Sequence, residues 1–137
     1  MFRSRFSNPA FKGFALALIA FFCVDHAAEA LGTAATPAAP SIVKVSAYGR
    51  QKCIVLIWNE VRTPDVKEYH VMRYDAADKD KTVSLVAVLP KNKIVSQHAY
   101  QDNNVENGHT YVYFVTAKNV YGVEGPNSPL APVGYAY

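Results

Sequence analysis

Turn-forming residues recur about every eight to twelve residues from position 41 onward, and no helical stripe of apolar residues lies between them. The intervals are filled by short runs rich in β-branched and aromatic residues, which favour strands. Strands and turns at this spacing are typical of an all-β sandwich. The pattern predicts about seven strands, at residues 41–47, 52–58, 68–74, 82–89, 94–100, 110–118 and 128–137.

Two of these runs indicate their own place in a sheet. The run 52–58 (KCIVLIW) is apolar on both faces, and the alternation of side chains along a strand puts Ile54, Leu56 and Trp58 on the same face. The last run contains Pro129 and Pro132, which lack a backbone N–H. That run is therefore expected at the edge of a sheet.

Residues 1–30 have the features of a secretory signal peptide that is removed by cleavage. Arg3, Arg5 and Lys12 precede an uncharged apolar run at 13–24, and the small residues of Ala28-Glu29-Ala30 fit a cleavage site. The run is shorter than the roughly twenty residues that a membrane-spanning helix needs. We expect a secreted, periplasmic or cell-surface protein whose mature chain has no stable membrane span. A retained N-terminal anchor is the alternative.

The mature chain divides into a linker at 31–40 (LGTAATPAAP) and one domain at 41–137. The linker is rich in Ala and Pro, without periodicity, and is expected to be flexible or extended. Three of the 14 basic residues and two of the 11 acidic residues belong to residues 1–30, so the mature chain is nearly neutral. It has no basic cluster, which argues against nucleic-acid binding.

Only one cysteine, Cys53, follows the predicted cleavage site. No disulfide can form within the mature chain, so its stability has to come from a packed core. A cysteine within a strand-like run is more often a small buried residue than a nucleophile. Pairing of Cys53 between two chains stays open.

Two segments carry the residue pattern of a known family. The first comprises Val55-Leu56-Ile57-Trp58, Pro64 and Tyr69-x-Val71, which resemble the second and third strands of a fibronectin type III domain. The second resembles its latter half, in Tyr100-x-Asp102, Val105, Gly108, Tyr111-x-Tyr113-x-Val115-x-Ala117-x-Asn119, Gly122 and Ser128. The resemblance covers residues 40–133. It implies a seven-stranded, immunoglobulin-like antiparallel β-sandwich preceded by the signal peptide.

The resemblance also implies which side chains form the structural core. Trp58 would lie between the two sheets, with Tyr69, Val71, Tyr111 and Val115 pointing inward. Tyr111 would form a tyrosine corner, its hydroxyl bonded to backbone near residues 105–106. The integrin-binding members of the family carry Arg-Gly-Asp in the loop before the last strand. Residues 119–125 (NVYGVEG) lack this motif, so their adhesive activity does not carry over.

The mature chain contains no motif that predicts catalysis. It has no Gly-x-Ser-x-Gly elbow, no glycine-rich phosphate loop and no His-x-x-x-His spacing. Its histidines, His70, His98 and His109, lie on three different segments. The loop 75–81 alternates Asp with Lys, and the lysines would repel a cation. We therefore predict a protein that is not an enzyme and has no metal site and no cofactor.

The candidate binding residues are those expected on the outer face of the sheet. If Tyr69, Val71, Tyr111, Tyr113 and Val115 fill the core, alternation turns the residues between them outward. A solvated sheet face is normally polar. This face would instead be largely apolar, which often marks an interaction site. The candidates are His70, Met72, Tyr74, Val112 and Phe114. The alternative is ordinary cross-strand pairing, or cover by the linker or the tail 135–137.

The function predicted from these features is recognition of another protein or of a cell-surface component. A second hypothesis is a structural subunit of an extracellular fibre or surface assembly. Such a subunit would associate with its own copies through edge strands or the linker. A third is a carbohydrate-binding accessory module, because exposed tyrosine rings stack on sugars.

Overall fold

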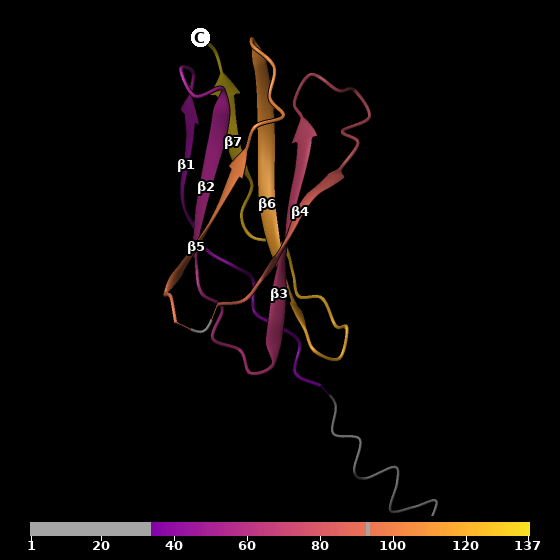
Figure 1. Ribbon diagram of the computed structural model, residues 1–137. Helices are drawn as coiled ribbons and strands as arrows, with labels where there is room; N and C mark the ends of the chain where they lie inside the picture. The colour runs from indigo at the N-terminus through magenta and orange to yellow at the C-terminus, as the bar shows by residue number, and fades with distance from the viewer. Residues whose placement is uncertain (1–33, 93) are drawn as a thin grey trace, which may run out of the picture. The chain divides into compact units, whose positions relative to one another are not determined.

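The computed structural model describes residues 34–92 and 94–137, which form seven strands and no helix (Figure 1). The predicted signal peptide at 1–30 lies outside these residues. The strands are β1 (Ile42–Tyr48), β2 (Cys53–Asn59), β3 (Val66–Asp75), β4 (Ser84–Pro90), β5 (Gln97–Asp102), β6 (His109–Asn119) and β7 (Ala131–Tyr135). No helix among the described residues is long and apolar enough to cross a membrane.

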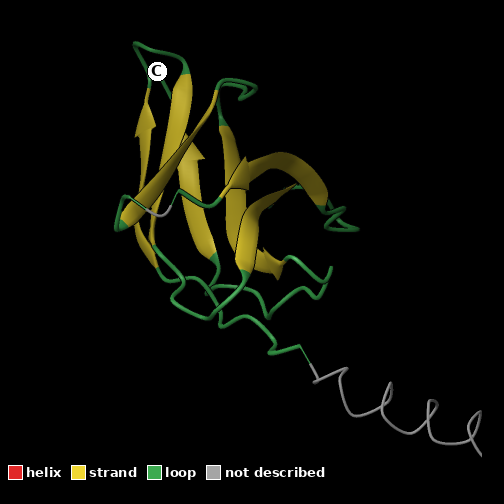
Figure 2. Cartoon of the chain, turned by 60° about the horizontal axis from the view of Figure 1, so that its bottom comes forward, coloured by secondary structure: helices red, strands yellow, loops and turns green. Residues whose placement is uncertain are grey.

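The strands form two antiparallel sheets, so the predicted seven-stranded sandwich is confirmed. One sheet has the order β1-β2-β5 and the other has the order β4-β3-β6-β7. Consecutive strands β2 and β3 belong to different sheets, and so do β4 and β5. Loops alone join the strands in this part of the chain (Figure 2). Strand β5 forms one edge of the first sheet, and strand β4 forms one edge of the second.

The core lies between the inner faces of the two sheets. Every second side chain along a strand points into it. The side chains of Trp58, Tyr69, Val71 and Val115 are completely buried, and that of Tyr111 is 5% exposed. The rings of Trp58 and Tyr69 meet edge to face, with centroids 5.6 Å apart. The backbone N–H of Glu106 donates to the Tyr111 hydroxyl at 2.9 Å, which is the hydrogen bond of a tyrosine corner.

The last strand is shorter than the predicted range 128–137. The N–H of Ser128 still donates to the carbonyl of Val115, so the chain already runs beside β6 there. Pro129 has no N–H to continue the ladder, and regular pairing begins only at Ala131. The weak fifth run starts three residues later than predicted, at Gln97.

Residues 34–40, part of the segment expected to be a flexible or extended linker, pack on the domain. Pro37 and Pro40 are among the fully buried side chains. The Asn119 side-chain amide donates to the carbonyl of Ala35 at 3.1 Å, and the N–H of Ala38 donates to the Thr63 hydroxyl at 3.0 Å. Proline restricts the unfolded chain and lacks a donor, so docking such a segment costs little.

Gly125 makes this docking possible, and we expect Gly125→Ala to displace residues 34–40. A Cβ at position 125 would lie 2.3 Å from the Pro37 carbonyl oxygen, so the backbone of one of the two segments has to move. Overpacking of this kind costs about 1–3 kcal/mol. Urea denaturation and amide exchange at Ala38 measure the effect. The matched control is Gly134→Ala, whose Cβ would have its nearest neighbour at 3.7 Å. Unchanged exchange at Ala38 in Gly125→Ala would contradict this account.

Candidate functional site

The predicted binding residues do lie on the outer face of the β4-β3-β6-β7 sheet, but they are less exposed than expected. His70, Met72 and Tyr74 are half-buried. Val112 and Phe114 are each only 7% exposed, so the expectation that they are exposed is wrong. Both belong to β6, which has β3 on one side and β7 on the other. Side chains from these two neighbours cover an inner strand on its outer face as well.

The strand register extends this face into an apolar row across the whole sheet. Met72 pairs with Leu85 of β4 on one side and with Phe114 of β6 on the other. Tyr113 pairs with Ala131, and Leu130 directly precedes Ala131 in the segment that runs beside β6. We call these four residues the apolar band: Leu85, Met72, Phe114 and Leu130.

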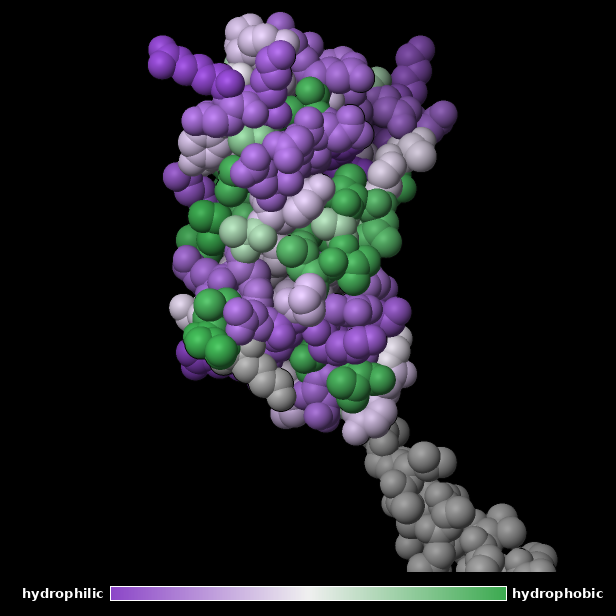
Figure 3. Space-filling view, in the orientation of Figure 1, coloured by the Kyte–Doolittle hydropathy of each residue, from purple (hydrophilic) through white to green (hydrophobic). Residues whose placement is uncertain are grey.

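The two ends of the apolar band are its exposed parts. Leu85 is 52% exposed and Leu130 is 57% exposed, while Val88, next to the band on β4, is 51% exposed. Figure 3 shows hydrophobic side chains gathered at mid-height where β4 runs in Figure 1. The site is therefore a band with a buried floor and an exposed rim on two edge segments.

Leu85, Val88 and Leu130 were not among the residues predicted for this face. On β4 a register shift between Val71 and Met72 breaks the simple alternation. Leu85 and Val88 both point outward although they are three positions apart. They therefore do not fit the period of two expected along a regular strand. Leu130 lies between Pro129 and Ala131, in a stretch whose two prolines, Pro129 and Pro132, interrupt the strand pattern. Only the pairing partners place these residues on the band.

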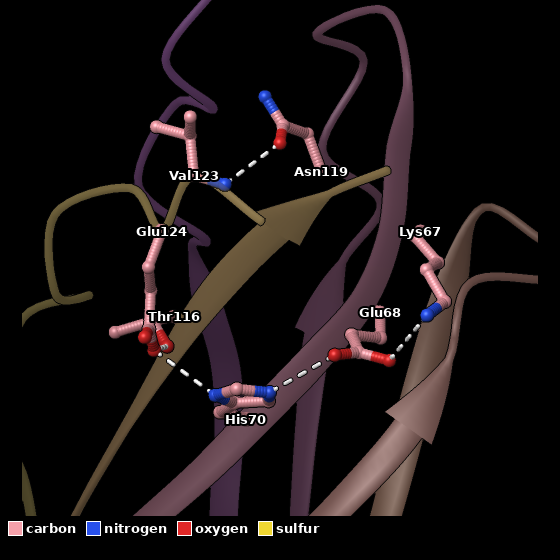
Figure 4. Close-up of polar contacts among 7 residues, drawn as sticks. All are labelled: Lys67, Glu68, His70, Thr116, Asn119, Val123 and Glu124. Carbon is pink, nitrogen blue, oxygen red and sulfur yellow. Dashed lines mark hydrogen bonds and ion pairs between the residues drawn. The ribbon is translucent and has the colours of Figure 1, made fainter. Parts of the chain in front are cut away.

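A polar cluster borders the apolar band and fixes the loop between β6 and β7 (Figure 4). His70 Nδ1 lies 3.1 Å from Glu124 Oε1, and His70 Nε2 lies 3.3 Å from Glu68 Oε1. The Thr116 hydroxyl donates to the same Glu124 oxygen. Both ring nitrogens of the predicted site residue His70 therefore already have partners within the domain.

The same loop is held from its other side by Asn119, which is 2% exposed. Its side-chain oxygen accepts hydrogen bonds from the N–H groups of Tyr121 at 3.0 Å and Val123 at 2.9 Å. Gly122 has a φ of 82°, a left-handed conformation that suits glycine. The loop therefore has a defined shape, with Val120 and Tyr121 exposed at its tip.

At the opposite end of the same sheet lies a polar cleft of about 330 Å³, lined in part by Tyr74, Asp75, Asp78 and His109. Asp75 Oδ2 lies 2.5 Å from His109 Nδ1. This hydrogen bond lowers the pKa of Asp75 and raises the pKa of His109. Hydrogen bonds from the N–H groups of Thr82 and Asp80 lower the pKa of Asp78.

The carboxylates of the cleft are engaged in hydrogen bonds within the domain. Its Asp carboxylates accept hydrogen bonds from their own loop or from His109, as the two Asx-type contacts of Asp78 illustrate. Among residues 34–92 and 94–137, no group of three His, Cys, Asp or Glu side chains is arranged to hold a metal ion. The cleft is best understood as the capped end of the β3–β4 hairpin.

A buried ionic cluster joins the two sheets below this cleft. Arg73 Nη1 donates to Asp102 Oδ2 at 2.6 Å and to the carbonyl of Asn104 at 2.7 Å. The Tyr113 hydroxyl donates to the same Asp102 oxygen at 2.8 Å, and burial raises the pKa of Tyr113. The Arg73 guanidinium also lies over the Tyr111 ring, 4.6 Å from its centroid. This cluster is structural, because every polar partner in it belongs to the domain.

Solved structures with the same arrangement of strands identify the fold. The chain is similar to an Fn3-like protein from Clostridium thermocellum, with a TM-score of 0.52 and 24% identity over 77% of this chain and 97% of that one. The domain has a fibronectin type III-like fold. Here, as in the resemblance noted from the sequence, Trp58 and the tyrosine corner lie in the core.

Other similar structures are parts of longer proteins. The chicken CNTN1 FN1–FN3 domains match with a TM-score of 0.57 and 19% identity, over 75% of this chain and 32% of that one. A beta-1,2-glucanase from Parabacteroides distasonis matches with a TM-score of 0.58 and 23% identity, over 77% of this chain and 13% of that one. At these identities the similarity concerns the fold.

No protein-family model matches the sequence, and no curated protein does.

Proposed function

We propose that this protein is an exported, non-enzymatic fibronectin type III-like module that recognises another protein or a cell-surface protein component. It binds through the outer face of the β4-β3-β6-β7 sheet. The observation that carries the proposal is the apolar band, with Leu85 and Leu130 more than half exposed at its two ends. Export rests on the predicted signal peptide at residues 1–30.

The arrangement of the band suits a protein partner. Exposed apolar side chains that are continuous with a buried floor can be covered over a wide area, as in the core of a protein interface. The floor, Phe114 and Met72, is held by neighbouring strands and does not need to reorganise on binding. The polar cluster around His70 and Glu124 supplies a bordering rim.

We expect the double variant Leu85→Asp/Leu130→Asp to lose its partner while it keeps its fold. Both side chains are exposed, so the charges stay in water, but they would be buried by a partner that covers the band. The immobilised mature protein from Leu31 onward is incubated with the surface and extracellular fraction of the exporting cell, and retained proteins are compared between variants.

The matched control is Val43→Asp, because Val43 is 52% exposed on β1 of the other sheet. Circular dichroism and urea denaturation verify that each variant is folded. Retention that depends on Leu85 and Leu130 but not on Val43 supports the proposal. Equal retention by the double variant and the wild-type protein would overturn the assigned face.

One observation favours a second candidate, a structural subunit that associates with its own copies. The edge strand β4 (SLVAVLP) carries no charge, and an uncharged edge strand can pair with another chain. Against this, β4 contains a bulge next to Val86 and ends in Pro90, both of which hinder pairing.

A further inference from the structure

His98 is a buried histidine at the contact between the two sheets. It lies on β5 and pairs with Trp58 of β2, and its side chain points inward. The residue is 8% exposed. Its imidazole stacks on the Trp58 ring with centroids 6.0 Å apart and lies 4.7 Å from the Tyr69 ring of the other sheet. The ring is thus part of the packed core rather than of the surface.

The surroundings of His98 suit the neutral imidazole and not the imidazolium. Among the described residues, His98 Nε2 is buried and has no hydrogen-bond partner. A neutral imidazole can leave one nitrogen unprotonated, whereas both nitrogens of the imidazolium are donors. The indole N–H of Trp58 in the same cluster is also buried without an acceptor. Protonation of His98 would add a second N–H donor and a positive charge at a buried position that has no hydrogen-bond acceptor.

The ionisable groups that face this cluster do not compensate for that cost. They are Glu60 after β2, Lys91 after β4 and Tyr69 on β3. Lys91 Nζ lies 3.3 Å from Glu60 Oε1 and donates to the carbonyl of Val61 at 2.8 Å, so Glu60 already has a cation. The Tyr69 hydroxyl accepts the N–H of Val61 at 2.9 Å.

Burial is the main cause that lowers the pKa of His98. The Lys91 charge lowers this pKa further, and the Glu60 carboxylate opposes both effects.

His98 is the second residue of β5, near the less anchored end of that strand. In the described part of the chain, β5 has six residues and pairs with β2 on one side only. The loop before it is exposed, with Ile94 93% exposed. Besides the ladder to β2, the start of β5 is anchored by the hydrogen bond from Glu60 N–H to the Ser96 carbonyl at 2.8 Å and by one between the side chains of Gln97 and Asn59 at 3.3 Å. Its end is held to the other sheet by the Arg73–Asp102 ion pair. The start of such an edge strand can therefore open before the core does.

We propose that His98 is an acid-sensitive latch, whose protonation releases the start of β5 from Trp58 and Tyr69. The device gives the module two states, a closed sandwich near neutral pH and an opened β5 edge in acid. It is independent of the apolar band, which lies on the other sheet, so a failed binding proposal leaves it intact.

The sign of the pH effect follows from linkage. In the unfolded chain His98 has the ordinary histidine pKa of about 6.5, whereas in the folded protein the pKa of His98 is lower. The stability that neutral His98 contributes is therefore present above that pH and is lost as the pH falls toward the pKa in the folded protein. In this interval the unfolding constant rises by up to about tenfold for each pH unit.

The test compares urea denaturation of the wild-type protein and His98→Phe between neutral and acid pH. Phenylalanine keeps an aromatic ring against Trp58 and cannot be protonated. Trp58 is the only tryptophan of the chain, so its fluorescence reports directly on this cluster. We expect the wild-type protein to lose more stability in acid than His98→Phe, with a difference of up to about tenfold in the unfolding constant per pH unit. Equal pH slopes for the two proteins would overturn the latch.

His109→Gln is the matched histidine control. The hydrogen bond to Asp75 raises the pKa of His109, so its contribution is present in acid and is lost as the pH rises. Removing it should change the pH profile with the opposite sign.

A second readout uses the wild-type protein alone and does not depend on the folding of a variant. Amide exchange of β5 should accelerate in acid relative to β6, after correction for the intrinsic pH dependence, and the His98 ring should titrate below the ordinary histidine range by NMR. Titration in the ordinary range with β5 protection unchanged would contradict the proposal.

Discussion

Replacing Asp102 with alanine is expected to lower the free energy of unfolding by about 3–5 kcal/mol, the cost of leaving one partner of a buried ion pair alone. Asp102 is 2% exposed and accepts hydrogen bonds from both Arg73 and Tyr113. Its removal leaves the buried Tyr113 hydroxyl without its acceptor. The Arg73 guanidinium, whose side chain is 16% exposed, loses its carboxylate and keeps only the Asn104 carbonyl. Urea denaturation of the mature protein at neutral pH measures the loss.

The control for this prediction removes the whole cluster. In Arg73→Met/Asp102→Leu/Tyr113→Phe the polar groups are replaced together by apolar ones of similar size. Such replacements are often neutral or stabilising. The triple variant should therefore recover most of the stability that Asp102→Ala loses. A loss below about 1 kcal/mol for Asp102→Ala, typical of a surface ion pair, would show that the cluster is solvated in solution.

Phe114→Asp is expected to cost about 3 kcal/mol or more, enough to unfold much of a domain of this size. Phe114 is 7% exposed on the floor of the apolar band, and an aspartate there would bury a charge without a partner. Leu85→Asp, at the exposed rim of the same band, should change the stability by about 0.5 kcal/mol or less, because surface substitutions rarely do more.

Chemical denaturation of the two variants side by side measures this difference. It also decides which residues can be used to test binding, since a variant that unfolds loses every partner. If Phe114→Asp is as stable as Leu85→Asp, the floor of the band is open to solvent and its boundaries have to be redrawn.

Much of the fold could be predicted because local patterns determine it. Alternation along β6 is enough to turn Tyr111, Tyr113 and Val115 to one side, and burial of a large ring places Trp58 between the sheets. Turn residues then set the strand boundaries to within a few residues. These properties depend on neighbours in sequence, so a single sequence contains them.

The candidate site could be predicted only in part, because exposure depends on neighbours in space. Alternation correctly puts Phe114 on the outer face, but it does not show that Met72 pairs with it or that the segment with Leu130 runs beside β6. The bulge on β4 hides Leu85 from any pattern with a period of two. A position can thus face outward and still be buried.

Pairings between distant segments were not predictable for the same reason. Arg73 and Asp102 are separated by 29 positions and belong to different sheets. Residues 34–40 read as a linker by composition, yet their contact with the β6–β7 loop depends on the hydrogen bond from Asn119 to Ala35, 84 positions away. Such contacts follow from the folded topology and not from local composition.

If the apolar band is free to meet a different protein, copies of this chain do not cover it in solution. Size-exclusion chromatography with light scattering on the mature protein from Leu31 onward measures this. We predict the mass of a monomer at every concentration, for the wild-type protein and for Leu85→Asp alike. A mass that grows with concentration and returns to that of the monomer in Leu85→Asp would contradict the proposed recognition of a different protein. That result would assign the band and the β4 edge to contacts between copies of this chain.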